Sequence, residues 1–347
     1  MDQAYVFIYL PGDTRAVPAG LFEHLPDVGA GRFRYGRRYR QRPAAMAVDP
    51  VALPLVLPER ETTLNDGVFG AIRDAAPDYW GRLVVAAELR TDPSALNEVD
   101  LLLWSNATRV GNLDFRTSPD AEEPEAAAPQ FAQLQDLLTA ADSLQAGEDV
   151  APHFIKLLRQ GSSLGGARPK CTVAYEKALW LAKFPCRDER MNLPRIEYAC
   201  MQLAGKCGIR IPELDVVRVG AADVLLVKRF DRTWTREGWR RSGFVSALSL
   251  AEWDERDRMS WSYPALAERM RQHCNRPDME ELFRRMLFNI MIRNTDDHPR
   301  NHGFLISSDG IRLSPAYDLV PSLTLPGVGT EFNLAMTVGD QGRLAAV

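Results

Sequence analysis

The sequence predicts an α+β protein of two lobes, the first rich in β-strands and the second mostly helical. Short apolar runs bounded by turn residues fill the early part of the chain, as in Tyr5–Leu10 followed by Pro11-Gly12-Asp13. Helical periodicity dominates from about residue 233 onward. A glycine-rich stretch at 161–170 separates two ordered segments, and an acidic, proline-rich linker at 117–130 divides the chain earlier.

Length and composition bound the class of protein. The chain has 347 residues, 46% hydrophobic and 25% charged, with a formal net charge of −4. This suits about two domains and excludes disordered, collagen-like and disulfide-scaffold proteins. No apolar run reaches the ~20 residues of a membrane span, and no secretory signal is evident. Five cysteines without a C-x-x-C pair indicate reduced thiols, so we expect a cytoplasmic protein with no membrane contact.

Residues 1–116 are predicted to form a small β-rich amino-terminal subdomain. Part of it interleaves arginines with aromatic residues: Arg32, Phe33, Arg34, Tyr35, Arg37, Arg38, Tyr39, Arg40 and Arg42. Such a pattern permits direct nucleic-acid binding. The alternative is a solvated strand and turn, and the near-neutral charge of the whole chain favours that interpretation.

After the linker, region 131–232 is predicted to resemble the amino-terminal lobe of a two-lobed enzyme, with a glycine-rich loop. The expected elements are a helix at Phe131–Leu144, a strand pair at Cys171–Tyr175 and Ala178–Lys183, a helix at about Arg195–Lys206, and strands at Leu214–Val219 and Asp223–Phe230.

Region 233–347 is predicted to be a helical lobe. Its clearest helix begins at Asp278, where Asp278 and Glu281 fit a capping box. Apolar residues then recur at helical spacing and predict a buried stripe: Leu282, Phe283, Met286, Leu287, Ile290 and Met291. A β-rich part, a glycine loop and a helical part in this order are the layout of a two-lobed kinase.

The loop after this helix has the spacing of a kinase catalytic loop. Kinases place an Asp that accepts or orients the substrate hydroxyl proton five positions before an Asn that holds Mg²⁺. Asp296 and Asn301 have this spacing, which selects Asp296 over Asp297. Because D-x-x-x-x-N also occurs by chance, a helix-capping cluster is the alternative.

Two further charged residues fit the same chemistry. Asp318 follows a strand–turn–strand run, where kinases place another Mg²⁺ ligand, although its flanks are not D-F-G. Lys183 ends an apolar strand, and burial of an unpaired ammonium is costly. This indicates an anionic partner, such as ATP phosphates or Glu197, although an exposed Glu197 fits the sequence equally well.

Two other interpretations of these motifs fail. Gly161-x-x-x-x-Gly166 begins like a Walker A loop, but Ala167-Arg168 replaces the required Lys-Ser/Thr. His298 and His302 are four residues apart, yet H-P-R-N-H lacks the glutamate of H-E-x-x-H and contains a helix-breaking proline, so no zinc site is expected. The glycine loop can still bring backbone N–H groups close to phosphates.

In combination, the motifs resemble the HipA family of serine/threonine kinases, the toxins of HipBA-type toxin–antitoxin systems. They are SSLGGARPK at 162–170, WLAKFP at 180–185, IEYACMQLA at 196–204, VKRFDR at 227–232, NTDDHPRNHGF at 294–304 and LSPAYDLVPS at 313–322. The amino-terminal part is also similar to the family's leading domain, including Pro77–Arg82, so the resemblance covers nearly the whole chain.

The resemblance implies ATP and Mg²⁺ as cofactors, with Asp296 as the catalytic residue and Asn301 and Asp318 as metal ligands. It implies nucleotide binding by Ser163, Leu164, Gly165, Gly166, Ala167, Arg168, Lys170, Lys183, Lys228, Arg229, Phe230, Asp297, His298 and Tyr317. The family's autophosphorylated serine falls at Ser163, where a dianion would be repelled by nucleotide phosphates.

The resemblance also implies a protein substrate, with aminoacyl-tRNA synthetases among those of the family, and a HipB-like helix-turn-helix antitoxin as partner. Operator DNA would be contacted chiefly through that antitoxin. The alternative is a nucleotide-binding pseudokinase that acts as a co-repressor with such a partner. The chain ends at Val347, where typical members continue with further helices, so a shortened carboxy-terminal lobe is expected.

Overall fold

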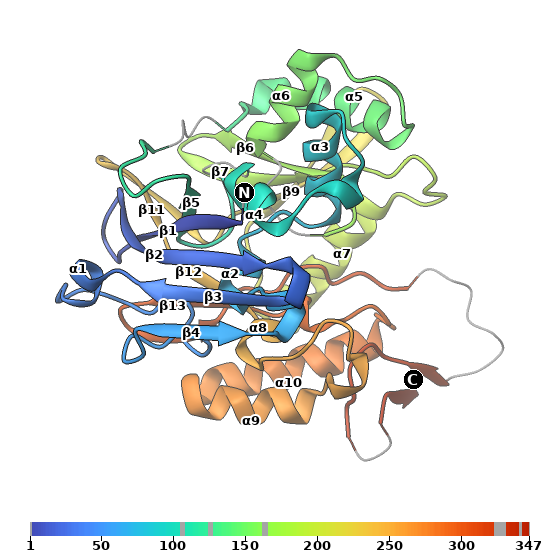
Figure 1. Cartoon of the computed structure of the whole chain (residues 1–347). Coiled ribbons are helices and arrows are strands. Elements are labelled where there is room, and N and C mark those ends of the chain that lie inside the picture. The colour runs from blue at the N-terminus through green and yellow to red at the C-terminus, as the bar shows by residue number, and fades with distance from the viewer. Residues whose placement is uncertain are drawn as a thin grey trace.

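A computed structural model describes residues 2–104, 108–123, 128–161, 166–322, 331–339 and 342–346. The first sheet is antiparallel, with strand order β4-β3-β2-β1-β5 (Figure 1). Its strands are β1 (Gln3–Tyr9), β2 (Ala16–Leu25), β3 (Ala30–Tyr35), β4 (Glu59–Thr62) and β5 (Leu113–Arg116). Helices α1 (Arg37–Arg40), α2 (Gly70–Asp74), α3 (Tyr79–Leu89) and α4 (Glu98–Trp104) lie between β3 and β5 in the chain.

The arginine-rich segment belongs to this first sheet and to α1. Its aromatic rings, Phe33, Tyr35 and Tyr39, are buried in the core and are therefore unavailable for stacking on bases. Arg32 instead pairs across the sheet with Glu59 and Glu61 of β4. The structure thus favours the interpretation of this segment as a strand and turn with a solvated face.

The second sheet has the strand order β6-β7-β9-β8. Its strands are β6 (Lys170–Tyr175), β7 (Ala178–Lys183), β8 (Leu214–Val219) and β9 (Ala222–Lys228), and α7 (Leu193–Lys206) packs on β8 and β9. The predicted hairpin is confirmed, because Glu176 and Lys177 both have left-handed φ values of 46° and 60°, as a two-residue turn requires.

Three helices contribute to a buried cluster with the second sheet: α3, α5 (Leu134–Gln145) and α6 (Pro152–Gly161) (Figure 1). Trp80 and Val84 of α3 share this cluster with Leu137 of α5 and Leu158 of α6. A helix that precedes the acidic linker therefore packs together with elements that follow the linker.

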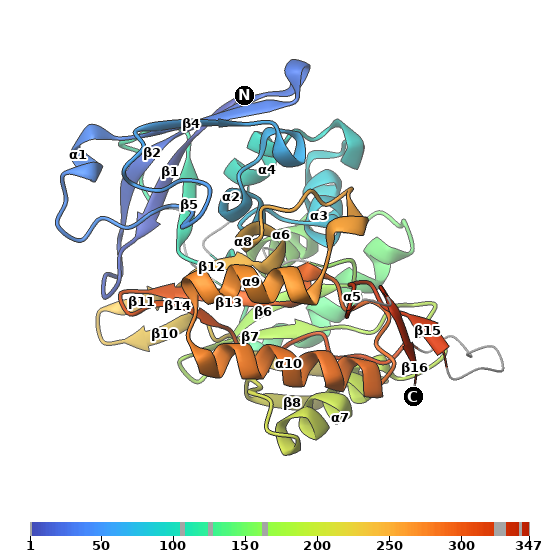
Figure 2. The same cartoon turned by 90° about the horizontal axis from the view of Figure 1, so that it is seen from below.

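The carboxy-terminal part combines helices with more strands than the sequence predicts. The described elements are β10 (Arg232–Thr235), β11 (Gly238–Arg241), β12 (Gly243–Ser246), α8 (Ala247–Leu250), α9 (Tyr263–His273), α10 (Arg276–Met291), β13 (Gly303–Ser307), β14 (Gly310–Leu313), β15 (Glu331–Asn333) and β16 (Leu344–Ala346). Strands β12, β13 and β14 form one antiparallel sheet behind α9 and α10 (Figure 2).

Helix α10 corrects two predictions. Asn275, not Asp278, caps it, since the Asn275 side chain accepts a hydrogen bond from the Asp278 N–H at 3.3 Å. The predicted apolar stripe is wrong at three positions, because Phe283, Leu287 and Met291 are 57%, 44% and 66% exposed. The buried face lies to one side of that stripe and includes four polar residues: Asp278, Glu281, Arg285 and Asn289.

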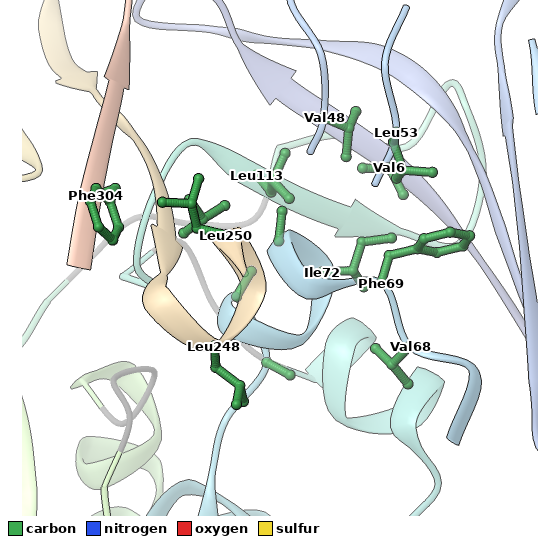
Figure 3. Packing of buried hydrophobic residues seen from close by; sticks show 14 of the residues in the cluster. Val6, Val48, Leu53, Val68, Phe69, Ile72, Leu113, Leu248, Leu250 and Phe304 are labelled. Atoms are coloured by element: carbon green, nitrogen blue, oxygen red, sulfur yellow. The ribbon is translucent and has the colours of Figure 1, made fainter. Parts of the chain in front are cut away.

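The largest buried cluster joins the first sheet to the carboxy-terminal part. Figure 3 shows Val6 and Leu53 from the leading region in the same cluster as Leu248, Leu250 and Phe304. The domain boundaries predicted at 1–116, 117–130, 131–232 and 233–347 remain predictions, and this core crosses them. None of the helices formed by the described residues is both long and apolar enough to traverse a bilayer.

Candidate active site

Three charged side chains from distant parts of the chain meet at one point. Lys183 lies at the end of β7, Glu197 in the second turn of α7, and Asp318 five residues after β14. The Lys183 Nζ donates a hydrogen bond to Glu197 Oε1 at 2.5 Å and a second one to Asp318. The structure therefore supplies the anionic partner that the sequence requires for this lysine.

The charges of this cluster depend on one another. Burial disfavours the ammonium form of Lys183, but Asp318 and Glu197 outweigh burial and raise the Lys183 pKa. Burial also disfavours the charged form of Asp318, yet Lys183 and then Lys170 hold the pKa of that carboxyl well below its usual range. For Glu197, burial dominates and raises the pKa, and Lys183 opposes the rise.

A second lysine stands directly beside Lys183. Lys170 of β6 is the cross-strand partner of Lys183 in the antiparallel β6–β7 ladder, so both side chains project from the same face of the sheet. Both lysines are buried. Like charges placed opposite one another repel, and a pair of buried ammonium groups is stable only where anions gather. This face of the sheet is suited to a polyanionic ligand.

The loop between α10 and β13 places two adjacent aspartates in different surroundings. Asp296 is exposed, whereas Asp297 is only 2% exposed and accepts a hydrogen bond from Tyr263 of α9. Asp297 Oδ1 also lies 3.2 Å from His302 Nε2. The Asp297 carboxylate thus supports the loop from inside, while the Asp296 carboxylate faces solvent.

Asn301 closes the same loop. Its Nδ2 donates to the backbone O of Asp296 at 3.2 Å, which leaves its carbonyl Oδ1 to accept or to coordinate. His302 faces Asp297, and the described residues contain no group of three His, Cys, Asp or Glu side chains that could hold a metal ion.

The segment that carries Asp318 is anchored to the buried face of α10. Arg285 donates to Glu281 Oε1 at 2.9 Å and to the backbone O of Ser314 at 2.6 Å. The N–H of Ala316 donates to the backbone O of Arg210, whose N–H in turn donates to Glu281 Oε1 at 3.0 Å. Glu281, one of the two acidic residues predicted as a cap, thus helps to place Asp318, and the other, Asp278, pairs with the same Arg210 at 2.7 Å.

The glycine-rich loop is described only from residue 166 onward, so the predicted Ser163, Leu164 and Gly165 lie outside the described residues. Gly166 has a φ of +117°, and a Cβ there would collide with Lys170 Nζ. Ala167 is exposed, and Arg168 pairs with Glu189 at 3.6 Å.

The predicted nucleotide-binding residues of the β9–β10 connection have different surroundings. Lys228 pairs with Glu213 at 2.6 Å. The Arg229 guanidinium is buried and donates to the Asp231 carboxylate at 2.9 and 2.7 Å, so it serves a structural network. The ring of Phe230 stacks on Tyr317 at 6.1 Å between centroids, immediately before Asp318.

A pocket of about 290 Å³ borders the Asp296 loop. Its lining residues include Asp296, His298, Arg300, Leu248, Trp261 and Arg343. Lys183 and Asp318 do not line this pocket.

Residues such as Tyr263 and Glu281 carry no local signal of their role, because their partners are remote in sequence.

Comparison with known proteins places this arrangement in a family. The family model described as HipA-like C-terminal domain matches residues 162–346, more than half of the chain. The serine/threonine-protein kinase toxin HipA of Shewanella oneidensis is 27% identical over 188 residues, which cover 46% of this chain and 42% of that protein. The kinase-named protein Y4mE of Sinorhizobium fredii is 25% identical over 294 residues, which cover 78% of this chain and 67% of that protein.

Among solved structures, the HipA of Shewanella oneidensis MR-1, determined with HipB and its operator DNA, has a TM-score of 0.66 at 18% identity. That match covers 95% of this chain and 79% of that one, and it establishes a common fold. The aligned regions span 42% to 67% of the lengths of the curated relatives. With the catalytic-loop spacing, the buried lysine cluster and this family match, the chain belongs to the HipA family.

Proposed function

We propose that this chain is a kinase that transfers the γ-phosphoryl group of ATP to a serine or threonine of a protein substrate. The observation that carries the proposal is the buried pair Lys170 and Lys183 beside Asp318. The two lysines form a cationic face, and the Asp318 carboxylate next to it is of the kind that binds metal ions. The two ammonium groups would contact phosphates, and Phe230 with Tyr317 would offer the adenine ring an aromatic flank.

Asp318 and Asn301 would hold Mg²⁺. Their carboxylate and amide oxygens are the hard ligands that this ion prefers, and the Asn301 hydrogen bond to Asp296 leaves its Oδ1 available. Bound Mg²⁺ would neutralise charge on the phosphates. Asp296, exposed beside the pocket, would accept or orient the proton of the acceptor hydroxyl, and the pocket would admit the substrate segment.

The proposal includes a HipB-like antitoxin as partner and autophosphorylation at Ser163. The partner is supported by a common fold with a HipA that was solved together with HipB and operator DNA. Ser163 is supported by the SSLGGARPK motif. An aminoacyl-tRNA synthetase is the substrate class that the sequence resemblance favours.

The test is intact mass spectrometry after incubation with Mg-ATP. We expect the wild-type chain to gain phosphate, and Asp296→Asn to lose about 10²- to 10⁴-fold in rate because the proton acceptor is removed. Asp309→Asn, in the exposed turn between β13 and β14, is the matched control and should behave like the wild type. Peptide mapping then tests Ser163.

Binding of Mg-ATP without any phosphate gain in the wild-type chain would contradict the kinase proposal. That result would favour a nucleotide-binding co-repressor. Asp296 contacts the proposed metal ligand Asn301 through its backbone O, which the change to asparagine preserves, so Asp296→Asn should still bind Mg-ATP in calorimetry.

A further inference from the structure

Helix α3, from the leading part of the chain, reaches the lysine cluster with its first residues. The indole Nε1 of Trp80 donates to the backbone O of Lys170 at 3.0 Å, and Trp80 is fully buried. Trp80 also belongs to the core beneath the second sheet. The backbone of Lys170 is thus fixed by a residue that lies 90 positions earlier in the chain.

Asp78, two residues before Trp80, contributes a carboxylate at the same place. A Cβ on Gly166 would lie against Lys170 Nζ and 4.0 Å from Asp78 Oδ2, so the ammonium and the carboxylate approach one point. The Oδ1 of Asp78 is buried and has no hydrogen-bond partner among the residues that the structure describes. Burial raises the Asp78 pKa to about 6, with the charge of Lys170 as the main opposing influence.

The local role expected of Asp78 is absent. Asp78 is the N-cap residue of α3, where an aspartate ordinarily accepts a hydrogen bond from the first turn, but its side chain makes no such bond. By contrast, Asp92 caps the short 3₁₀ helix Pro93–Ala95 and accepts from the Ser94 N–H at 2.8 Å. The Asp78 carboxylate is therefore oriented by something other than helix capping.

The segment around Asp78 is held by both lobes. Asp74 accepts from the N–H of Ser246 at 2.6 Å, and Arg73 pairs with Glu255, which also pairs with Arg300 of the catalytic loop at 3.4 Å. Together with Trp80, these contacts fix the α2–α3 connection in place. Because this connection is fixed, the Asp78 carboxylate that it carries can orient the neighbouring Lys170 ammonium.

We propose that Asp78 is a positioning residue of the nucleotide site, which directs the Lys170 ammonium toward ATP phosphates. This inference rests on the proposed function, since Lys170 is taken to contact those phosphates. The Asp78 carboxylate acts on this ammonium through its charge, and an ammonium with three N–H donors can still donate to a phosphate. The leading part of the chain thereby takes part in nucleotide binding.

The experiment is a double-mutant cycle read by calorimetric titration with Mg-ATP, which needs no turnover. We expect Asp78→Asn and Lys170→Gln each to weaken binding by about tenfold or more. The double variant should bind about as weakly as Lys170→Gln alone, because Asp78 acts only through that lysine. Asp92→Asn and Glu88→Gln, the latter on α3 itself, are the matched controls and should bind as the wild type does.

Asp78→Ser separates this role from helix capping. Serine is a good N-cap but carries no charge, so it should preserve the thermal midpoint and still weaken Mg-ATP binding. Three results would each overturn the proposal. They are wild-type affinity for Mg-ATP in Asp78→Asn, additive losses of affinity in the double variant, and wild-type affinity in Asp78→Ser. A wild-type chain that binds no Mg-ATP overturns the proposed function as well, whereas binding without transfer leaves this test intact.

Discussion

Under the proposed function, replacing Lys183 with methionine is expected to reduce phosphate transfer by about 10²-fold or more, since one preorganised cation at the phosphates would be lost. The same change leaves the buried Glu197 without its cation. We expect Glu197 to become protonated as a result, because its pKa is already raised by burial. Methionine retains most of the apolar length of lysine, so packing of β7 should be preserved.

Initial rates with Mg-ATP, together with urea unfolding, check this prediction. Lys206→Met is the control, because Lys206 is an exposed residue of α7. If Lys183→Met transferred phosphate at the wild-type rate, Lys183 would serve the fold alone. Lys183→Arg keeps the charge, and it should recover stability better than activity, since a guanidinium does not reproduce the geometry of an ammonium.

Replacing Asp231 with asparagine is expected to lower the free energy of unfolding by about 3–5 kcal/mol. Asp231 is buried and pairs with both Arg229 and Arg232, at 2.7 and 2.8 Å. These arginines also donate to backbone carbonyls of Thr108, Arg109 and Gly111, just before β5. The network joins the first sheet to the β9–β10 connection, and its loss would leave two buried cations without their anion.

The effect of Asp231→Asn should depend on pH in a defined direction. Burial opposes the charge of Asp231, but Arg229 and Arg232 outweigh it and hold the Asp231 pKa well below its usual value. The stabilisation is therefore fully present above the unfolded pKa of about 3.9 and is lost as the pH falls below it. The urea midpoint of Asp231→Asn should lie below that of the wild type at both pH 7 and pH 3, and this difference should be smaller at pH 3. The control variant Asp215→Asn changes an exposed residue, so its midpoint should equal that of the wild type at either pH. A gap of equal size at both pH values would contradict an ionic origin.

The sequence predicted the features that are determined by residues close to one another in the chain. The hairpin around Glu176-Lys177, the helix that carries Glu197 and the catalytic-loop spacing of Asp296 and Asn301 depend on residues a few positions apart. The α10 face was mispredicted because its core side contains charged residues whose partners, such as Arg210 and Arg312, come from other segments.

The candidate site shows the same division. Spacing selected Asp296, but no local signal indicated that Asp297 would meet Tyr263 and His302, or that Asp78 would approach Lys170 from the leading region. Such contacts depend on long-range packing. Motif resemblance supplied roles for residues such as Arg229, whose side chain the fold then uses for the Asp231 network.

The shared core of Figure 3 has a consequence for synthesis of the chain. Its first contributors lie between Ala4 and Phe115, whereas Phe304, Ile311 and Leu313 emerge from the ribosome far later. At ~5–20 residues per second, the interval from Phe115 to Phe304 is about 10–40 s. During that interval the leading sheet lacks part of its apolar cover, and contacts so distant in sequence slow folding. The proposed nucleotide site includes Asp318, so a nascent chain cannot assemble that site until the segment after β14 has been translated.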